Sequence, residues 1–234
     1  MNNYMPSELI SIIIPAYNEE ESIQQVIAEL TAHTSSLNIE IIVIDDGSID
    51  KTREIVEQLE NVNLIVHTKN KGKGKALQNG FEHATGEFLV IQDADMEYHP
   101  RDIPFLVDPL LRGEADVVYG SRFASGDIKT MSYSHRFGNW LLTLFTRILY
   151  GFKTTDMETG YKAFRRDLIQ NVEITANSFN IEPELTAIFS KRKAKFVEIP
   201  ISYSYREKGD AKISWVDGVV ALWWLFKLKF RRYR

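Results

Sequence analysis

The sequence predicts an α/β fold in which a mostly parallel sheet is flanked by helices. In the first half, short segments rich in Ile, Val and Leu alternate with longer segments whose apolar residues recur at helical spacing. Such alternation is typical of parallel sheets with helices on both faces. The apolar segments also end in polar or charged residues, and ligands of such sheets bind beyond the carboxyl ends of the strands. We therefore expect the functional site at that edge.

Five apolar segments predict the strands of the first half, because their length and composition suit buried strands. They are residues 9–15, 40–44, 63–66, 87–91 and 116–119. Between them, helical spacing of apolar residues predicts helices over 20–34, 51–60 and 76–84.

The second half is less regular and predicts helices over 137–152, 182–193 and 214–230. Residues 196–203 predict a strand, which Pro200 places at a sheet edge because proline has no N–H to donate. We expect the aromatic residues of 137–152 to lie in the core rather than in a lipid groove. No internal repeat or linker is visible, so we expect one domain over residues 1–234.

The composition excludes several classes of protein. The chain has 234 residues, with 28 Lys and Arg against 32 Asp and Glu, whereas a dedicated nucleic-acid binder is normally strongly basic. The absence of cysteine excludes a disulfide scaffold, a thiolate metal site and a cysteine nucleophile. The N-terminal segment lacks the pattern of a signal peptide, and the longest apolar run, 219–226, is too short to span a bilayer. We expect no transmembrane segment.

Polar groups suited to a nucleotide surround the ends of the first three predicted strands. The first strand leads into Pro-Ala-Tyr-Asn-Glu-Glu, where a simple turn does not explain Tyr17. The second ends in Asp45 and Asp46, which favours either a helix-capping turn or a contact from Asp46 to a nucleobase or ribose. After the third, residues 69–76 hold four lysines, Lys73 among them, and two glycines. This pattern indicates anion binding at a helix N-terminus or, alternatively, a solvated lysine run.

The fourth predicted strand leads into a pair of carboxylates. Asp93 and Asp95 lie two residues apart, so an extended backbone directs both side chains to the same side. With Glu97 they suit Mg²⁺ or Mn²⁺, completed by diphosphate oxygens and water. Phosphatases of the haloacid dehalogenase type carry DxD after their first strand, followed by x-Thr, which this segment does not match. The fifth strand leads to Arg122, whose guanidinium group suits either a bidentate contact to a phosphate or a surface salt bridge.

Eight segments along the chain carry a family resemblance. IIIPAYNEE, VIDDGSID, NKGKGKAL, IQDADMEYHP and VVYGSRF, in this order, resemble the family 2 glycosyltransferases with the GT-A fold. TDMETGYKAFRRD, FNIEPELTA and EIPISYSYREKGDAKISWVDGVVALW are similar to the polyprenyl- and dolichyl-phosphate hexosyltransferases within that family, the branch of the dolichol-phosphate mannose synthases. The resemblance covers residues 10–224.

The resemblance implies roles for particular positions. Those expected to hold a nucleotide-sugar are Pro15, Ala16, Tyr17, Glu19, Ile44, Asp46, Lys73, Asp93, Ala94 and Asp95. The implied metal ligands are Asp93, Asp95 and Glu97, and the implied phosphate-binding groups on the acceptor side are Arg122, Arg206 and Lys212. Residues 9–123 would form the nucleotide-sugar half, 124–213 the acceptor half and 214–234 a basic amphipathic helix.

The implied reaction is the metal-dependent, inverting transfer of a hexose from a nucleotide-sugar to a polyprenyl phosphate. GDP-mannose, UDP-glucose and UDP-N-acetylglucosamine all suit the donor site, with Asp95 and Arg122 among the catalytic residues. A phosphate acceptor is largely dianionic at neutral pH and needs no strong base, whereas a sugar hydroxyl would need one. Asp156 is the candidate for such a base. Its alternative role is a helix cap or a group that orients Arg122 or Lys162.

Two other functions stay open at this point. One is a family 2 glycosyltransferase with a saccharide acceptor, in polysaccharide or cell-wall synthesis, and the other is a non-catalytic nucleotide-sugar-binding protein. The basic C-terminal end favours a lipid phosphate. Helical spacing of apolar and basic residues there is typical either of an interfacial helix on an anionic membrane or of a core-packed helix with a solvated basic end. We expect a cytoplasmic protein bound peripherally to the cytoplasmic face of the membrane.

Overall fold

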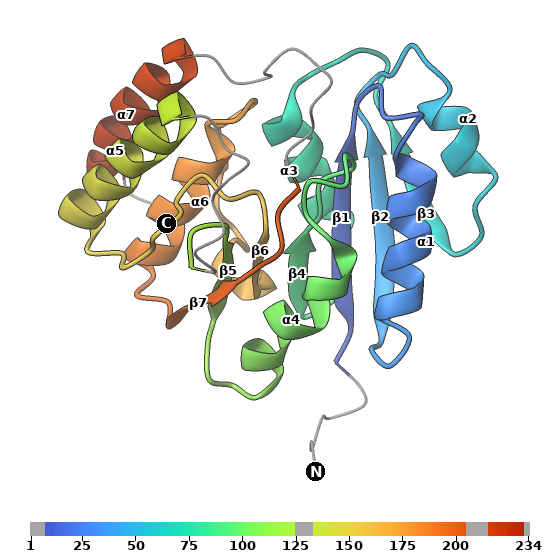
Figure 1. The fold of residues 1–234 in the computed structure, drawn as a ribbon, viewed down its shortest axis with the longest axis horizontal. Coiled ribbons are helices and arrows are strands. Elements are labelled where there is room, and N and C mark those ends of the chain that lie inside the picture. The colour runs from blue at the N-terminus through green and yellow to red at the C-terminus, as the bar shows by residue number, and fades with distance from the viewer. Residues whose placement is uncertain (1–7, 125–132, 205–214, 232–234) are drawn as a thin grey trace.

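The structure, a computed structural model, describes residues 8–124, 133–204 and 215–231. Within these residues one sheet of seven strands forms the centre, in the order β3-β2-β1-β4-β6-β5-β7 (Figure 1). The strands are β1 (Ile10–Ala16), β2 (Ile39–Asp45), β3 (Val62–Val66), β4 (Phe88–Ile91), β5 (Val117–Ser121), β6 (Lys162–Arg165) and β7 (Phe196–Pro200). Neighbouring strands are parallel, except that β6 is antiparallel to both β4 and β5. The mostly parallel α/β sheet is therefore confirmed.

The predicted strands all exist, and β7 lies at the sheet edge as Pro200 indicated. Strand β6 was not predicted. It has four residues, and two of them, Lys162 and Arg165, are basic, so its composition does not indicate a buried strand. It forms because β4 and β5 both need a hydrogen-bonding partner on the sides that face each other.

The helices are α1 (Ile23–His33), α2 (Thr52–Glu57), α3 (Lys73–His83), α4 (Ile103–Leu111), α5 (Tyr133–Tyr150), α6 (Ile181–Lys191) and α7 (Trp215–Phe230), with short 3-10 turns at Pro100–Asp102 and Arg166–Leu168. Helix α4 was not predicted, and it contains two prolines. Pro104 lies in the first turn, where a missing N–H costs little. Helix α3 begins at Lys73, three residues before the predicted start.

Side chains of β1 alternate between two cores, one on each face of the sheet. Ile12 and Ile14 pack with residues of α1, α2 and α4, whereas Ile13 packs with residues of α3 and α6. This two-residue period is the expected geometry of a strand buried on both faces. The sheet is therefore rigidly held between two helical layers, and its carboxyl edge is a fixed platform.

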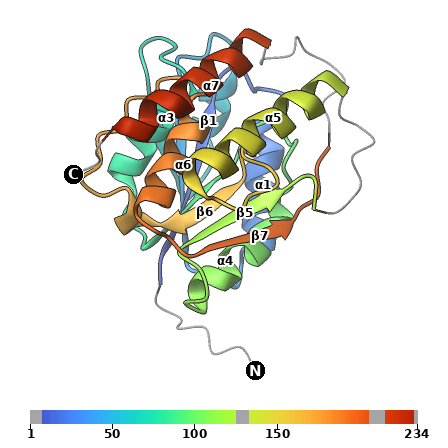
Figure 2. The same ribbon diagram turned by 90° about the vertical axis from the view of Figure 1, so that its left-hand side faces the viewer.

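Helices α5 and α7 form an outer layer over α6, side by side (Figures 1 and 2). The prediction that the aromatic residues of 137–152 lie in the core is confirmed for Phe152, which is buried, but is wrong for three others. Phe137, Trp140 and Phe145 are exposed by 64, 56 and 41%, and the apolar Ile148 beside them is exposed by 71%. The outer face of α5 is therefore the apolar one.

The buried face of α5 is largely polar, which explains the wrong prediction. Asn139, Thr143 and Thr146 are buried there together with Leu142. The side chain of Asn139 accepts a hydrogen bond from the backbone of Glu158, and Thr143 accepts one from Met157. Within the described residues, no helix combines the length and the apolarity that crossing a bilayer requires.

Two glycine-to-alanine substitutions should change stability in opposite directions. A Cβ at Gly80 of α3 would overlap the buried Ile13 side chain, and so Gly80→Ala should destabilise the fold by about 1–3 kcal/mol. A Cβ at Gly138 of α5 would contact nothing, so Gly138→Ala should stabilise by about 0.5–1 kcal/mol through helix propensity. Urea unfolding of both variants measures this; equal shifts of the same sign would contradict the packing described here.

Candidate functional site

The candidate site lies where the connections change direction along the sheet. From β1 the chain proceeds outward through β2 and β3, and it then returns to β4 on the other side of β1. The crevice outside the carboxyl ends of β1 and β4 is the usual ligand site of such a sheet. Pro15 and Ala16 end β1, and Asp93 and Asp95 follow β4, so the structure brings these sequence-predicted residues to one edge.

The residues that follow β1 present one exposed ring and one buried acid. Tyr17 is 39% exposed, as a group that stacks on a base would be, whereas Glu19 is 3% exposed. Ser22 donates a hydrogen bond of 3.0 Å from its hydroxyl to the Glu19 carboxylate. On β2, Ile44 is fully buried.

The carboxylate of Asp46 is bound by three donors of its own chain. It accepts hydrogen bonds from the backbone N–H groups of Lys71 and Gly72, at 2.9 and 2.8 Å, and lies 2.6 Å from His67 Nδ1. Asn79 Nδ2 can only donate a hydrogen bond, and it lies 2.8 Å from Nε2 of His67. Nε2 is therefore the acceptor, so His67 carries its proton on Nδ1 and donates a hydrogen bond from there to Asp46. The N–H groups expected to hold a ligand anion therefore hold Asp46. The predicted nucleobase contact of Asp46 stays a prediction.

Three carboxylates gather after β4, each with a different partner. Lys73 Nζ lies 2.7 Å from Asp93 Oδ1. Tyr203 donates its hydroxyl proton to Glu97 at 2.9 Å, and the Glu97 N–H donates to Asp95 at 3.1 Å. Within the part of the chain described, no three acidic or histidine side chains are grouped as a metal site, so the predicted set of three metal ligands stays a prediction.

Asp95 shows the electrostatic cost of this arrangement. Burial, followed by the negative charges of Asp93, Glu97 and Glu19, raises the pKa of Asp95 to about 7. A divalent cation would remove this repulsion, and carboxylate oxygens are ligands that Mg²⁺ and Mn²⁺ prefer. The donor chemistry at Asp93 and Asp95 therefore fits a metal whose remaining ligands come from a diphosphate and water.

Two charged residues of the site were not predicted, namely Glu182 at the start of α6 and Lys162 in β6. Lys162 is fully buried and donates to Glu182, which lies 3.5 Å from Lys73 Nζ. Burial lowers the pKa of Lys162 more than the charge of Glu182 raises it. Two features of the sequence could have indicated this pair: Lys162 is a charged residue among apolar ones, and Glu182 is an acid in the first turn of a predicted helix.

Arg122 and Asp156 form a buried bidentate ion pair. Arg122 Nε and Nη2 each lie 2.7 Å from one oxygen of Asp156, and the Arg122 N–H adds a third bond at 3.1 Å. Asp156 is fully buried, and both of its oxygens are engaged. This geometry favours the role of orienting Arg122 over the role of general base. Arg206 and Lys212 lie outside the described residues.

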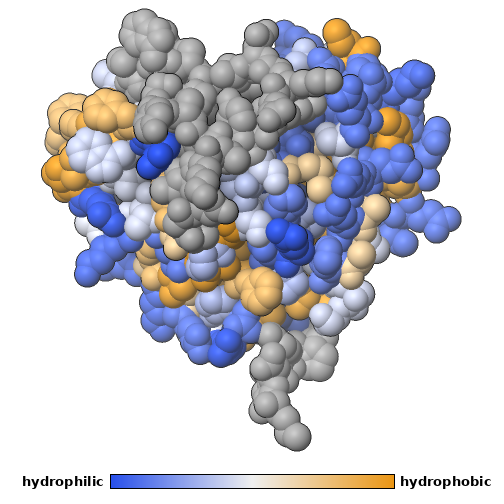
Figure 3. Space-filling model, viewed as in Figure 1, coloured by the Kyte–Doolittle hydropathy of each residue, from blue (hydrophilic) through white to orange (hydrophobic). Residues whose placement is uncertain are grey.

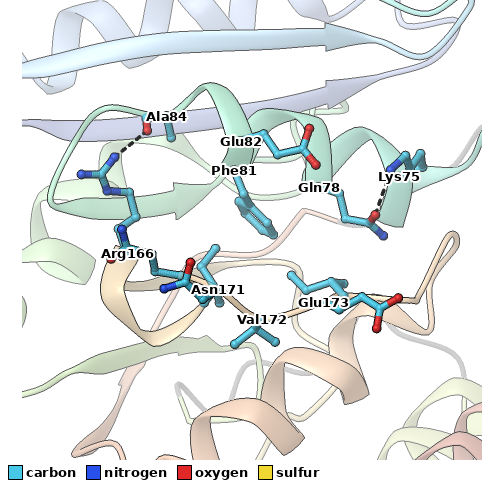
Figure 4. A pocket seen from close by; sticks show the side chains of 12 residues that line it. Lys75, Gln78, Phe81, Glu82, Ala84, Arg166, Asn171, Val172 and Glu173 are labelled. Carbon is cyan, nitrogen blue, oxygen red and sulfur yellow. Dashed lines mark hydrogen bonds between the residues drawn. The ribbon is translucent and has the colours of Figure 1, made fainter. Parts of the chain in front are cut away.

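Two cavities lie near these elements. One, of about 220 Å³, lies beside the Arg122 loop and is lined by Phe123 and Thr155 together with Trp140, Arg136 and Arg147 of α5. The other, of about 570 Å³, lies between α3 and residues 166–174 (Figure 4). In this second cavity, Lys75 binds Gln78 and Arg166 binds the carbonyl of Ala84. In the first, Arg147 likewise donates from Nε to the carbonyl of Thr154 at 2.8 Å.

The buried carboxyl group of Glu158 should make the stability of the fold depend on pH. Its Oε1 is buried with no hydrogen-bond partner among the described residues, and burial, with the charge of Glu182, raises its pKa from 4.5 to about 7. The folded state therefore holds this proton more tightly than the unfolded state, and the stability that Glu158 contributes is lost as pH rises from about 4.5 to 7. Glu158→Gln should raise the free energy of unfolding at pH 8 by about 2 kcal/mol more than at pH 5.

The matched control is the exposed Glu60→Gln, which should change the free energy of unfolding little and equally at both pH values. Chemical denaturation at pH 5 and pH 8 measures both variants. A Glu158→Gln effect that does not grow with pH would contradict the buried, proton-holding carboxyl group.

Comparisons with known proteins place this geometry in a family. Residues 11–172 match the model of glycosyl transferase family 2. The chain is 30% identical over 211 residues to dolichol-phosphate mannosyltransferase of Pyrococcus furiosus, covering 87% of this chain but only 59% of that protein. It is 31% identical to UDP-N-acetylglucosamine–dolichyl-phosphate N-acetylglucosaminyltransferase of Methanococcus voltae, covering 89% of this chain and 90% of the relative.

Solved structures show the same fold. The structure of glucosyl-3-phosphoglycerate synthase from Mycobacterium tuberculosis with UDP aligns with a TM-score of 0.77 at 21% identity, over 95% of this chain and 80% of that one. The same enzyme with Mn²⁺, UDP and phosphoglyceric acid aligns with a TM-score of 0.75. The chain therefore belongs to glycosyltransferase family 2 and has the GT-A fold.

Proposed function

We propose that this protein transfers a hexose from a nucleotide-sugar to a polyprenyl phosphate at a membrane surface. The observation that carries the proposal is the cavity next to Phe123 and Thr155. Its wall contains Arg136 and Arg147, and it also contains Trp140, which belongs to the exposed apolar face of α5. A ligand that combines a phosphate with a hydrocarbon tail matches this combination of basic and apolar groups. The two relatives that are named for dolichyl phosphate support the same acceptor class.

The donor half of the proposal rests on the carboxyl edge of the sheet. We propose that Tyr17, Glu19 and Asp46 lie against the nucleoside and that Asp93 and Asp95 hold Mg²⁺ or Mn²⁺ with the donor diphosphate. When bound, the metal would offset the charge that develops on the leaving diphosphate. We propose that Pro15, Ala16, Ile44 and Ala94 border the donor at this edge, and Lys73 contributes a positive charge next to Asp93.

The reaction that fits these groups is an in-line displacement. A phosphate oxygen of the acceptor forms a bond to C1 of the hexose, and the bond from C1 to the diphosphate oxygen breaks with inversion. The attacking oxygen is already negatively charged, so no proton has to be removed. Arg122, held in place by Asp156, supplies positive charge next to the transferred group. Asp156 is then a positioning residue, and Arg206 and Lys212 are proposed to bind the acceptor phosphate.

The membrane surface in the proposal is formed by α5 and α7 together. Besides the α5 residues, α7 exposes Trp223, Phe226 and Phe230 by 58, 58 and 72%. Apolar side chains gather at the left of the view, where these helices lie (Figure 3). Lys227 lies over the rings of Trp223 and Trp224, at 5.1 and 4.7 Å from their centroids, which places positive charge among the aromatics. Aromatic and basic groups on one face suit an anionic lipid surface.

A transfer assay tests the proposed activity. Labelled GDP-mannose, UDP-glucose or UDP-N-acetylglucosamine is incubated with undecaprenyl or dolichyl phosphate and Mn²⁺, and the label is counted in the organic phase. One donor should give an organic-extractable product, and Asp95→Asn should reduce its rate by about 100-fold, because a ligand for the charge-offsetting cation is lost. Asp167→Asn, an exposed aspartate away from the sheet edge, serves as control. Label that enters only a saccharide would establish the alternative acceptor, and no transfer with any donor would overturn the proposal.

Vesicle flotation tests the membrane surface. The double substitution Trp140→Ser and Phe226→Ser should weaken binding to phosphatidylcholine vesicles containing phosphatidylglycerol by about tenfold, because apolar area no longer enters the interface. Phe105→Ser, a substitution of an equally exposed phenylalanine on α4, should leave flotation unchanged. Equal loss of binding in both variants would contradict a surface confined to α5 and α7.

A further inference from the structure

Four side chains of alternating charge run from the end of β4 into the core. Lys73 Nζ lies 2.7 Å from Asp93 Oδ1 and 3.5 Å from Glu182 Oε1, and the other oxygen of Glu182 binds Lys162. The side chains of Lys73 and Asp93 are 15 and 18% exposed, whereas those of Glu182 and Lys162 are 4 and 0% exposed. The pair nearer to solvent belongs to the candidate donor site, and the deeper pair belongs to the core.

The two ends of this chain are held to different degrees. Lys162 also donates to the carbonyls of Met157 and Thr159, so it is fixed and fixes one oxygen of Glu182. The other oxygen, Oε1, is buried with no hydrogen-bond partner among the described residues. A buried carboxylate oxygen without a hydrogen bond is costly. Lys73 needs to move by only about 0.7 Å to reach the 2.8 Å of a charge-assisted hydrogen bond to Oε1.

The space around Lys73 and Asp93 depends on Gly160. A Cβ at this position would overlap Asp93 Oδ2 and lie 3.2 Å from Lys73 Nζ. The absence of a side chain at Gly160 therefore leaves room for the Asp93 carboxylate and the Lys73 ammonium. The Lys73 ammonium thus lies between two carboxylates. It is within hydrogen-bond distance of Asp93, but Glu182 Oε1 is 3.5 Å away.

We propose that Asp93 and Glu182 share Lys73 as a counter-ion, and that Lys73 passes from Asp93 to Glu182 when Asp93 takes a divalent cation. The inference rests on the proposed metal-dependent function. Before metal binds, Lys73 offsets the charge of Asp93 and competes with the metal for it. After binding, Glu182 Oε1 gains its missing hydrogen bond, and the ammonium stays in the site. Glu182 is thus a positioning residue that lowers the cost of releasing Asp93.

Mn²⁺ titration followed by electron paramagnetic resonance tests the exchange, with no nucleotide and no turnover. Lys73→Met removes the competing charge, so it should tighten Mn²⁺ binding by about tenfold. Glu182→Gln removes the second partner of Lys73, so it should weaken Mn²⁺ binding by about tenfold. When Glu182→Gln is added to Lys73→Met, it should change the Mn²⁺ affinity little, because no Lys73 ammonium remains for Glu182 to bind.

Matched controls separate the exchange from general effects. Lys71→Met removes one exposed lysine of the same loop, and it should change Mn²⁺ affinity by less than about twofold. If Glu182→Gln fails to fold because Lys162 loses its partner, then Lys162→Met with Glu182→Gln removes both buried charges and should show the same weakening. If Lys73→Met binds Mn²⁺ with the same affinity as Lys71→Met, the shared counter-ion is overturned, whereas the proposed metal dependence is not. A wild-type protein that binds no Mn²⁺, with or without a nucleoside diphosphate, would overturn the proposed metal dependence as well.

Discussion

The carboxylates that follow β4 are the constraint around which the site is built. Asp93 and Asp95 are held at the edge of a rigid sheet, close to Glu97 and Glu19, and burial together with the repulsion among these groups raises the pKa of Asp95. Like charges at a partly buried position require positive partners, and Lys73, at the start of α3, supplies one to Asp93. Lys73 in turn lies 3.5 Å from Glu182. A second cation, Arg122, follows β5 and is held by Asp156.

This arrangement gives the two halves of the proposed reaction a common electrostatic basis. On the donor side, Lys73 and Asp93 form an ion pair that a metal and a diphosphate can reorganise. On the acceptor side, Asp156 uses both oxygens to fix the Arg122 fork, so this cation is preorganised. The cavity next to Phe123 is also lined by Trp140, which belongs to the exposed aromatic face of α5.

Local sequence pattern predicted the parts of the fold that depend on local physics. The apolar periods of β1, β2 and α1 fixed these elements, and the polar residues after β1 and β4 indicated the edge that holds the site. Strand β6 escaped prediction because it exists only through the partners on both of its sides. Helix α4 escaped because composition does not reveal that Pro104 lies in a first turn.

Contacts between distant residues were harder to predict. The chain of Asp93, Lys73, Glu182 and Lys162 joins β4, α3, α6 and β6, and no spacing along the sequence encodes it. Asp46 looked available for a ligand, yet the loop before α3 folds onto it. The aromatic residues of α5 looked like core residues because apolar character alone does not tell which side of a helix faces the protein. The buried Asn139 and Thr143 reveal that side only after the fold is known.

We propose that the carboxylates after β4 hold a divalent cation and that Glu182 binds Lys73, the counter-ion that Asp93 then releases. An anomalous difference map from crystals grown with Mn²⁺ and a nucleoside diphosphate tests it most directly. We expect a manganese peak within ligand distance of Asp93 and Asp95, with Lys73 Nζ hydrogen-bonded to Glu182 Oε1. A peak elsewhere, or manganese at Asp93 with Lys73 still bonded to that carboxylate, would contradict it.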